Sequence, residues 1–523
     1  MQTTPRSGGR IAAICLALSL AFTAKTSAAI DLAQSWQLAL MHDPVYAAAR
    51  ANYRAMMEKM PQARSALLPQ VAASAAGGYL DSRANTAFGQ VYQNSNGAWA
   101  LTLSQPIFNW SAWQTYEQSK LVVASAEIQL QIAYQDLVLR VGQAYFDVLA
   151  AQDTLAALEA EQRAIGEQLA SATRRFEMGK ATITDTYESQ SRYDLVTANI
   201  IGAQNVVQNA KDILARILGQ PTDQLSVLPY SVALPAPVPN QLQKWSEQAQ
   251  AANLELIRAQ LQTRIAEADV EIAKGGNYPT VSVFASSSSN TLGNMAVQPY
   301  YNGRTVDNVV GVMVSVPIYS GGAVTSRVAE KSELQQKSTF DLEAAKRQAL
   351  QQSQQYFNGV TSGLARIKGL EASEKSSRSS LQANRTGYEV GVRINLDVLN
   401  AQQQLYATMR ELTLARYNTV IVGLRLRANS GVLSEADLLA INPLLREPGT
   451  PGTGILDSQR QPATPAKPQA SSALPATPVR TQISSASPAQ PALPAPQVQP
   501  SESASPPMSG LKLSVHQPQQ STW

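Results

Sequence analysis

The chain has 523 residues, of which only 6% are aromatic and 15% are charged, and its formal net charge at pH 7 is +4. The positive charge is spread along the chain without the Lys/Arg block that follows a phosphate backbone, which argues against nucleic acid as a partner. Ala, Gln and Ser are correspondingly abundant in place of aromatic and charged residues. This composition favours long helices over a compact enzyme.

The first 29 residues predict a secretory signal peptide. Arg6 and Arg10 precede an apolar run over residues 11–22, and small residues follow up to Ala29. A run of about 12 apolar residues is too short to cross a bilayer, which needs about 20; a short uncleaved helix is the alternative. Cys15, the only cysteine, lies inside this run. The mature chain, starting near Ile30, therefore has no thiol for a disulfide, a metal or a nucleophile.

The rest of the chain repeats itself once, at an offset of 210 to 212 residues. Three pairs of motifs occur in the same order: Leu68-Pro69-Gln70-Val71 with Tyr278-Pro279-Thr280-Val281, Ser104-Gln105-Pro106-Ile107-Phe108 with Ser315-Val316-Pro317-Ile318-Tyr319, and Phe176-Glu177-Met178-Gly179 with Tyr388-Glu389-Val390-Gly391. We therefore predict two structural units over residues 30–228 and 241–442. A proline-rich link over residues 229–240 joins them.

Each unit is predicted to run helix, strand, strand, long helix, glycine turn, helix. In the first unit these are residues 31–66, 71–79, 98–108, 112–177 and 185–218, with the turn at Gly179. In the second unit they are residues 241–274, 280–287, 309–319, 323–385 and 396–429, with the turn at Gly391.

The predicted strands have the length that a tilted strand needs to cross the hydrocarbon of a membrane. Their side chains alternate, with Trp99, Leu101 and Leu103 on one face. No stretch after the signal approaches 18 uninterrupted apolar residues, so a membrane crossing requires a closed barrel. Four strands do not close one, whereas three chains supply twelve, which predicts a homotrimer. A soluble sandwich hairpin is the alternative for the strands alone.

The long helices carry a coiled-coil seam of alternating four and three residue steps, as in Val398, Ala401, Leu405, Thr408, Leu412, Ala415, Thr419 and Val422. A helix of about 65 residues reaches on the order of 100 Å. Its small, partly polar seam suits the wall of a water-filled tube; a solid coiled-coil stalk is the alternative. The predicted fold class is an α+β membrane protein: a trimeric 12-stranded β-barrel continuous with an α-helical barrel.

The sequence predicts neither an enzyme nor a cofactor or metal site. His42 is the only histidine before His516, which removes a His-based triad and most zinc sites. Phosphate-loop, dinucleotide and zinc-protease motifs are missing. Residues 443–523 are dominated by Pro, Ala, Ser and Gln, and we predict a disordered periplasmic tail there.

The run Gly387-Tyr388-Glu389-Val390-Gly391-Val392-Arg393-Ile394-Asn395-Leu396-Asp397-Val398-Leu399-Asn400-Ala401 closely resembles the second helical hairpin of the TolC outer membrane factor family. Residues 176–185 resemble the first hairpin, and the resemblance extends over about residues 31–442. It implies a homotrimer in the lipid of the outer membrane that extends into the periplasm. A periplasmic adaptor and an inner-membrane ABC or proton-driven transporter are the implied partners.

The resemblance also implies a narrow periplasmic aperture with two acidic positions three residues apart, which match Asp397 and Asn400. Such residues share one helix face, so a trimer would stack a ring of carboxylates on a ring of amides. One acidic ring instead of two predicts weaker cation selectivity. The alternative is that Asp397 is a solvated acid favoured by the helix dipole.

The family's closed state further implies links between hairpins, carried here by Tyr388 and Arg393 facing Thr184 and Asp185, within or across subunits. An Arg393–Asp185 contact would be a charge-assisted hydrogen bond, although exposed pairs contribute only about 0 to 1 kcal/mol each. The alternative is that Arg393 and Asp185 merely cap the hairpin turns.

We expect the chain to be the outer-membrane exit duct of a type I protein secretion system. The nearest rival is a drug or metal efflux duct, whose members often carry an N-terminal lipid cysteine that this sequence lacks at the cleavage site. A trimeric coiled-coil surface protein is a remote alternative. The internal duplication argues against it, because a stalk needs no returning helices.

Overall fold

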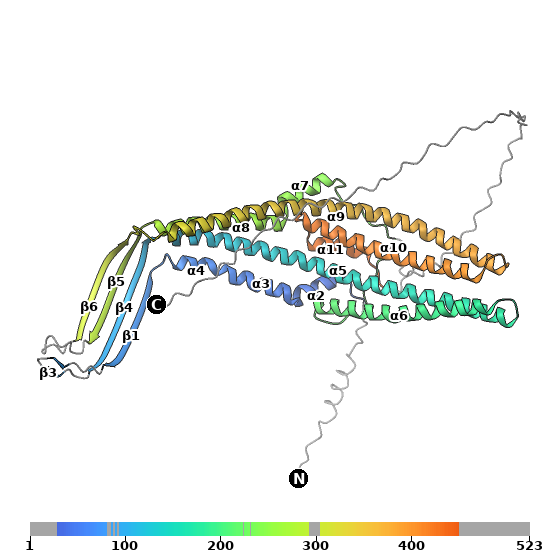
Figure 1. Cartoon of the computed structure of the whole chain (residues 1–523), viewed down its shortest axis with the longest axis horizontal. Helices are drawn as coiled ribbons and strands as arrows, with labels where there is room; N and C mark the ends of the chain where they lie inside the picture. The colour runs from blue at the N-terminus through green and yellow to red at the C-terminus, as the bar shows by residue number, and fades with distance from the viewer. Residues whose placement is uncertain are drawn as a thin grey trace, which may run out of the picture. The chain divides into compact units, whose positions relative to one another are not determined.

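The computed structural model describes residues 29–80, 85–86, 89–90, 94–222, 224–230, 232–291 and 304–448. Residues 1–28 of the predicted signal peptide and the chain from residue 449 onward lie outside these ranges. Within them the chain folds as two helix–strand–strand–helical hairpin units, as the internal repeat predicts (Figure 1).

Four strands form one antiparallel sheet in the order β1-β4-β5-β6. Their bounds are β1 Gln70–Leu80, β4 Asn94–Phe108, β5 Thr280–Thr291 and β6 Arg304–Ser315, and a short pair, β2 Asn85–Thr86 and β3 Gly89–Gln90, lies between β1 and β4 in sequence. The pairing of β4 with β5 joins the two repeats, with Trp99 opposite Ser289 and Leu103 opposite Ala285. The last strand ends at Ser315, four residues before the predicted end, because Pro317 has no N–H to continue the ladder.

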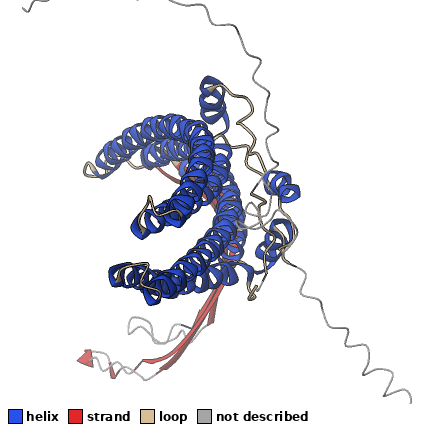
Figure 2. Ribbon diagram, turned by 90° about the vertical axis from the view of Figure 1, so that its right-hand side faces the viewer, coloured by secondary structure: helices blue, strands red, loops and turns tan. Residues whose placement is uncertain are grey.

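Two long helical hairpins contain most of the helical residues that the structure describes. The first pairs α5 (Trp110–Glu177) with α6 (Ile183–Leu218), and the second pairs α9 (Ala323–Glu389) with α10 (Asn395–Asn429). The 68 residues of α5 span on the order of 100 Å. The helix α10 also packs against α5, so it joins the two hairpins. Figure 2 shows the helices arranged alongside one another in a curved layer. Among the described helices, none combines the length and the apolar character needed to cross a bilayer.

The helix predicted over residues 31–66 is broken into α2 (Leu32–His42), α3 (Pro44–Met57) and α4 (Lys59–Ser65). Asp43 is extended because it precedes a proline, and its carboxylate caps α3. The same break recurs 210 residues later, where Asn253 separates α7 (Leu242–Ala252) from α8 (Leu254–Lys274) and caps α8. The helix-period pattern continues through both capping residues, so periodicity alone predicts one unbroken helix in each repeat.

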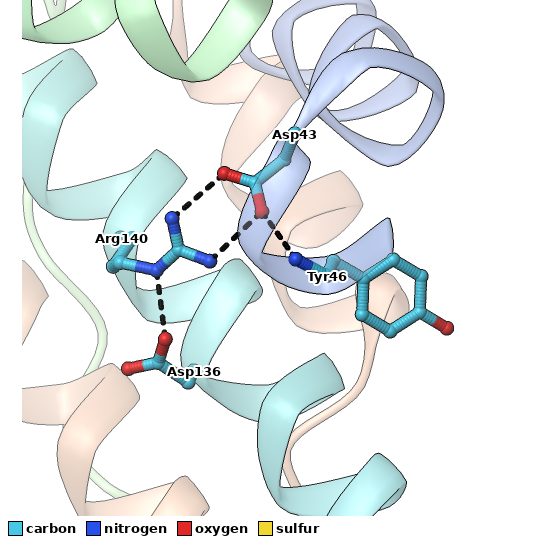
Figure 3. Close-up of polar contacts among 4 residues, drawn as sticks. All are labelled: Asp43, Tyr46, Asp136 and Arg140. Atoms are coloured by element: carbon cyan, nitrogen blue, oxygen red, sulfur yellow. Dashed lines mark hydrogen bonds and ion pairs between the residues drawn. The ribbon is translucent and has the colours of Figure 1, made fainter. Parts of the chain in front are cut away.

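Asp43 also holds the broken helix against α5 through Arg140 (Figure 3). The guanidinium donates to the two Asp43 oxygens at 2.8 and 3.2 Å and, through Nε, to Asp136 at 2.7 Å. Burial alone would raise the pKa of Asp43, but the hydrogen bonds from Arg140 and from the Tyr46 backbone N–H outweigh it and lower that pKa. The first helix is thus fixed by a charged cap that stays ionised.

A central core forms where α2, α5, α6 and α10 meet α11 (Glu435–Ile441). Tyr145 is fully buried in it and donates its hydroxyl to the backbone oxygens of Ser226 at 2.7 Å and Ile30 at 3.2 Å. Beyond α11 the chain makes a 3-10 turn, η3 (Asn442–Leu444), and Arg446 then pairs with Val227 through two backbone hydrogen bonds. The folded part therefore extends beyond residue 443, where the tail was predicted to start.

Candidate functional site

Each hairpin turns at a glycine in the left-handed region, with φ of 71° at Gly179 and 83° at Gly391. The turn after α5 is closed by hydrogen bonds from Gly179 N to Phe176 O at 2.8 Å and from Lys180 N to Arg175 O at 2.7 Å. A residue with a Cβ is strained in this conformation, so these two positions need glycine. Both predicted turn residues thus lie at the hairpin tips.

The two predicted aperture residues lie on the first turns of α10, at the tip of the second hairpin. Asp397 is partly exposed, and its carboxylate lies 3.7 Å from the Arg393 guanidinium. Asn400 accepts a hydrogen bond of 3.1 Å from Arg192 of α6, and the same guanidinium donates to Gln403. Each predicted aperture residue therefore has an arginine of the same chain beside it. Whether the residues form rings depends on how several copies of the chain assemble.

The four predicted gate-locking residues lie at the two tips. Thr184 is exposed, and Asp185 forms a capping box with Thr182, with both hydrogen bonds at 3.3 Å. The Tyr388 ring lies under the Arg175 guanidinium, 4.5 Å from its centroid. Burial, with the nearby Asp185 charge, raises the pKa of Tyr388 although Arg175 opposes the shift. Within one chain Arg393 contacts Asp397, so a link from Arg393 to Asp185 of another subunit stays a prediction.

The sequence gives no sign of the role of Asn395, which makes three hydrogen bonds between the hairpins within one chain. Its side chain is fully buried and donates to Asp185 O at 3.0 Å and Ser189 Oγ at 2.8 Å, both on α6. Its oxygen accepts from Gln168 Nε2 of α5 at 2.6 Å. In the sequence, Asn395 differs from an ordinary residue at a helix start only by lying seven residues before Gln402, a spacing that places both on one face of a supercoiled helix.

A second unpredicted site binds the proline-rich link to the second hairpin. Arg416 of α10 is 4% exposed and donates to the backbone oxygens of Pro229 at 3.0 Å, Val232 at 2.6 Å and Tyr230. The Tyr230 hydroxyl in turn donates to Glu374 of α9 at 2.9 Å, and Glu374 pairs with Arg378 at 2.6 Å. We call this arrangement the Arg416 clamp. The link predicted only to join the repeats therefore also binds both helices of the second hairpin.

Two acidic side chains of α5 reach α10 close to the Arg416 clamp. Asp153 accepts a hydrogen bond of 2.6 Å from the Tyr417 hydroxyl, and Glu161 pairs with Arg410 at 2.6 Å. Burial raises the pKa of Asp153 to about 6, although the Tyr417 hydrogen bond and the Arg416 charge act in the opposite direction. The contact between α5 and α10 thus includes acidic side chains from α5. Within the described ranges no group of three or more His, Cys, Asp or Glu has the arrangement of a metal site.

Comparisons with known proteins agree with this architecture. A family model described as "Outer membrane efflux protein" matches residues 36–220 and 245–432, one segment in each repeat. The outer membrane protein TolC of Escherichia coli K12 is 34% identical over 450 residues, which cover 83% of this chain and 89% of that protein. The alkaline protease secretion protein AprF of Pseudomonas aeruginosa is 31% identical, with 78% and 86% covered.

The fold is also that of a solved channel structure. The outer membrane protein VceC of Vibrio cholerae superposes with a TM-score of 0.65 at 18% identity, covering 76% of this chain and 96% of that one. This likeness confirms the predicted fold class of long paired helices with four strands per chain. The chain thus belongs to the outer membrane efflux protein family, and it is a TolC-type, non-enzymatic transport channel of the outer membrane that extends into the periplasm.

Proposed function

We propose that the chain is the exit duct of a tripartite type I secretion system, which passes a protein from an inner-membrane transporter and a periplasmic adaptor to the exterior. The observation that carries this proposal is the similarity, over most of both chains, to a protein named for alkaline protease secretion. Drug efflux is the second candidate, because the matching family model is named for efflux.

The proposed duct is a trimer. In one chain β1 and β6 are the two edges of the sheet, and each has a partner on one side only. Open edges are not tolerated in hydrocarbon, so edge pairing among three copies would give a closed barrel of twelve strands. Val310, Val312 and Val314 of β6 are 60–80% exposed in the single chain, which suits contact with lipid.

A secretion experiment separates the two candidate functions. The gene is deleted from its own bacterium, and both the culture-medium proteome and the antibiotic susceptibility are measured, with the gene restored on a plasmid as control. We expect one or more large proteins to disappear from the medium and to return on complementation. An unchanged medium with greater antibiotic sensitivity would instead identify an efflux duct.

The proposed aperture makes Asp397→Ala informative. A ring of carboxylates raises the local cation concentration in a narrow pore, so its removal is expected to lower the cation-to-anion permeability ratio several-fold. The ratio is obtained from the reversal potential of single channels in planar bilayers under a salt gradient. Asp194→Ala is the matched control, since Asp194 is an exposed acid of α6 outside the tip. Equal ratios in wild type and Asp397→Ala would exclude the ring.

The proposed latch places Tyr388 and Arg393 against Thr184 and Asp185, within one subunit or across to its neighbour. Asp185 is partly exposed and 59% of the Arg393 side chain is exposed, which is compatible with such a contact. Each pair contributes little by itself, and a weak, repeated link suits a gate that opens when the adaptor and the transporter engage it.

A further inference from the structure

Polar residues occupy a buried stripe of α10 where apolar ones are expected. Asn395 and Gln402 are both 0% exposed, Met409 is also 0% exposed, and Arg416 is 4% exposed. These residues are spaced by seven, which places them on one face of a supercoiled helix. A single polar residue at such a position fixes the register of a coiled coil and reduces its stability.

The first member of the stripe has all of its hydrogen-bonding groups engaged. Asn395 uses its amide nitrogen for Asp185 O and Ser189 Oγ and its oxygen for Gln168 Nε2. These partners lie on α6 and α5, the two helices of the first hairpin. Asn395 therefore stabilises the packing of the second hairpin against the first at the tip.

The next member, one heptad further, is the reverse case. The Nε2 and Oε1 atoms of Gln402 are both buried without a hydrogen-bond partner among the described residues. Its neighbours on the same helix face, Val398, Leu405 and Tyr406, pack with Ala157, Ala160 and Ala164 of α5. A polar group enclosed in an apolar cluster without a partner destabilises the packing that encloses it.

We propose that Asn395 and Gln402 are opposing positioning residues for separation of the two hairpins. Asn395 holds α10 against α5 and α6, whereas Gln402 loses its hydrogen bonds in the packed state and regains them when α10 moves away from α5. The packing thus has a defined register without being so stable that the tip stays shut. This proposal rests on the proposed duct function, because only a duct requires the two hairpins to separate.

Two substitutions are expected to act in opposite directions. Gln402→Leu removes two unpaired polar groups and introduces an apolar side chain of similar volume, so packing should tighten. Asn395→Ala removes three hydrogen bonds, so packing should loosen. Gln404→Leu is the matched control, because Gln404 is an exposed glutamine of the same helix. Gln402→Met serves as a second variant if the branched side chain does not fit.

Amide hydrogen exchange of the full-length protein in detergent gives a readout that does not depend on transport. We expect peptides covering residues 395–409 to exchange about tenfold or more slowly in Gln402→Leu, faster in Asn395→Ala, and at the wild-type rate in Gln404→Leu. In planar bilayers the open fraction should fall for Gln402→Leu and rise for Asn395→Ala.

Several outcomes would overturn the proposal. Exchange that is unchanged or faster in both Gln402→Leu and Gln402→Met would mean that Gln402 does not oppose packing. Opposite exchange effects with identical open fractions would mean that the residues do not position the gate. A gene deletion that leaves the culture medium unchanged is a separate result: it would remove the proposed cargo and leave the exchange and conductance effects intact.

Discussion

Alanine in place of Arg416 is expected to lower the free energy of unfolding by about 3 kcal/mol or more. Three backbone carbonyls in the link lose their donor, and each buried unpaired carbonyl costs roughly 1 to 3 kcal/mol. The Arg416 guanidinium also lies 5.5 Å from the centroid of the Tyr230 ring, and that favourable contact is lost as well. The link between the repeats should then separate from α10 before the hairpins unfold.

The measurement is thermal unfolding followed by circular dichroism in mild detergent, with limited proteolysis to detect cleavage in residues 229–240. Arg416→Lys should be intermediate, because an ammonium keeps the charge but lacks the planar arrangement of donors. Arg425→Ala is the matched control, since Arg425 is an exposed arginine of the same helix with one hydrogen bond, to Gln143. If Arg416→Ala and Arg425→Ala unfold at the same temperature, the clamp does not stabilise the fold.

Asparagine in place of Asp153 is expected to stabilise the protein near neutral pH. Burial raises the pKa of this carboxyl from 3.8 to about 6, so above that pH the folded state holds a carboxylate that the unfolded state accommodates more easily. A shift of this size corresponds to about 2 to 3 kcal/mol. The amide oxygen of asparagine still accepts the hydrogen bond from Tyr417, so the substitution removes the charge and keeps the contact.

The direction with pH follows from proton binding. Between the unfolded pKa and the folded pKa of Asp153, the folded state holds a proton that the unfolded state has released, so the free energy of unfolding falls as pH rises through that window. Asp153→Asn should remove this fall. Unfolding is compared at about pH 4.5 and pH 7.5, with Asp212→Asn as control because Asp212 is an exposed acid of α6. A variant that is less stable than wild type at the higher pH would refute the assignment.

Much of the architecture could be predicted from the sequence because it depends on local rules. The seven-residue pattern of α10 predicts a packed helix, and the glycines at 179 and 391 predict turns that only a positive φ can close. Pro69 and Pro279 delimit the strands that follow them. Each of these signals is contained within a few neighbouring residues, so the sequence displays it directly.

The capping breaks at Asp43 and Asn253 are less visible in the sequence. A single extended residue does not interrupt the helical period, and both positions contain residues that also occur on ordinary helix surfaces. Asp43 is marked in the sequence by the proline that follows it, but its contact with the guanidinium of Arg140 lies 97 positions further along the chain. The sequence contains both residues but does not indicate that they meet.

The sequence by itself determined the repeat, the strands, the hairpins and their glycine turns, because periodicity and backbone preference act over short distances along the chain. Only the tertiary structure decided that Asn395 bonds to Gln168 and that Arg416 binds the link at Tyr230, partners that lie 227 and 186 positions away. A polar side chain on a helix looks the same in sequence whether water or a neighbouring helix surrounds it. Which of the two applies depends on how the hairpins pack.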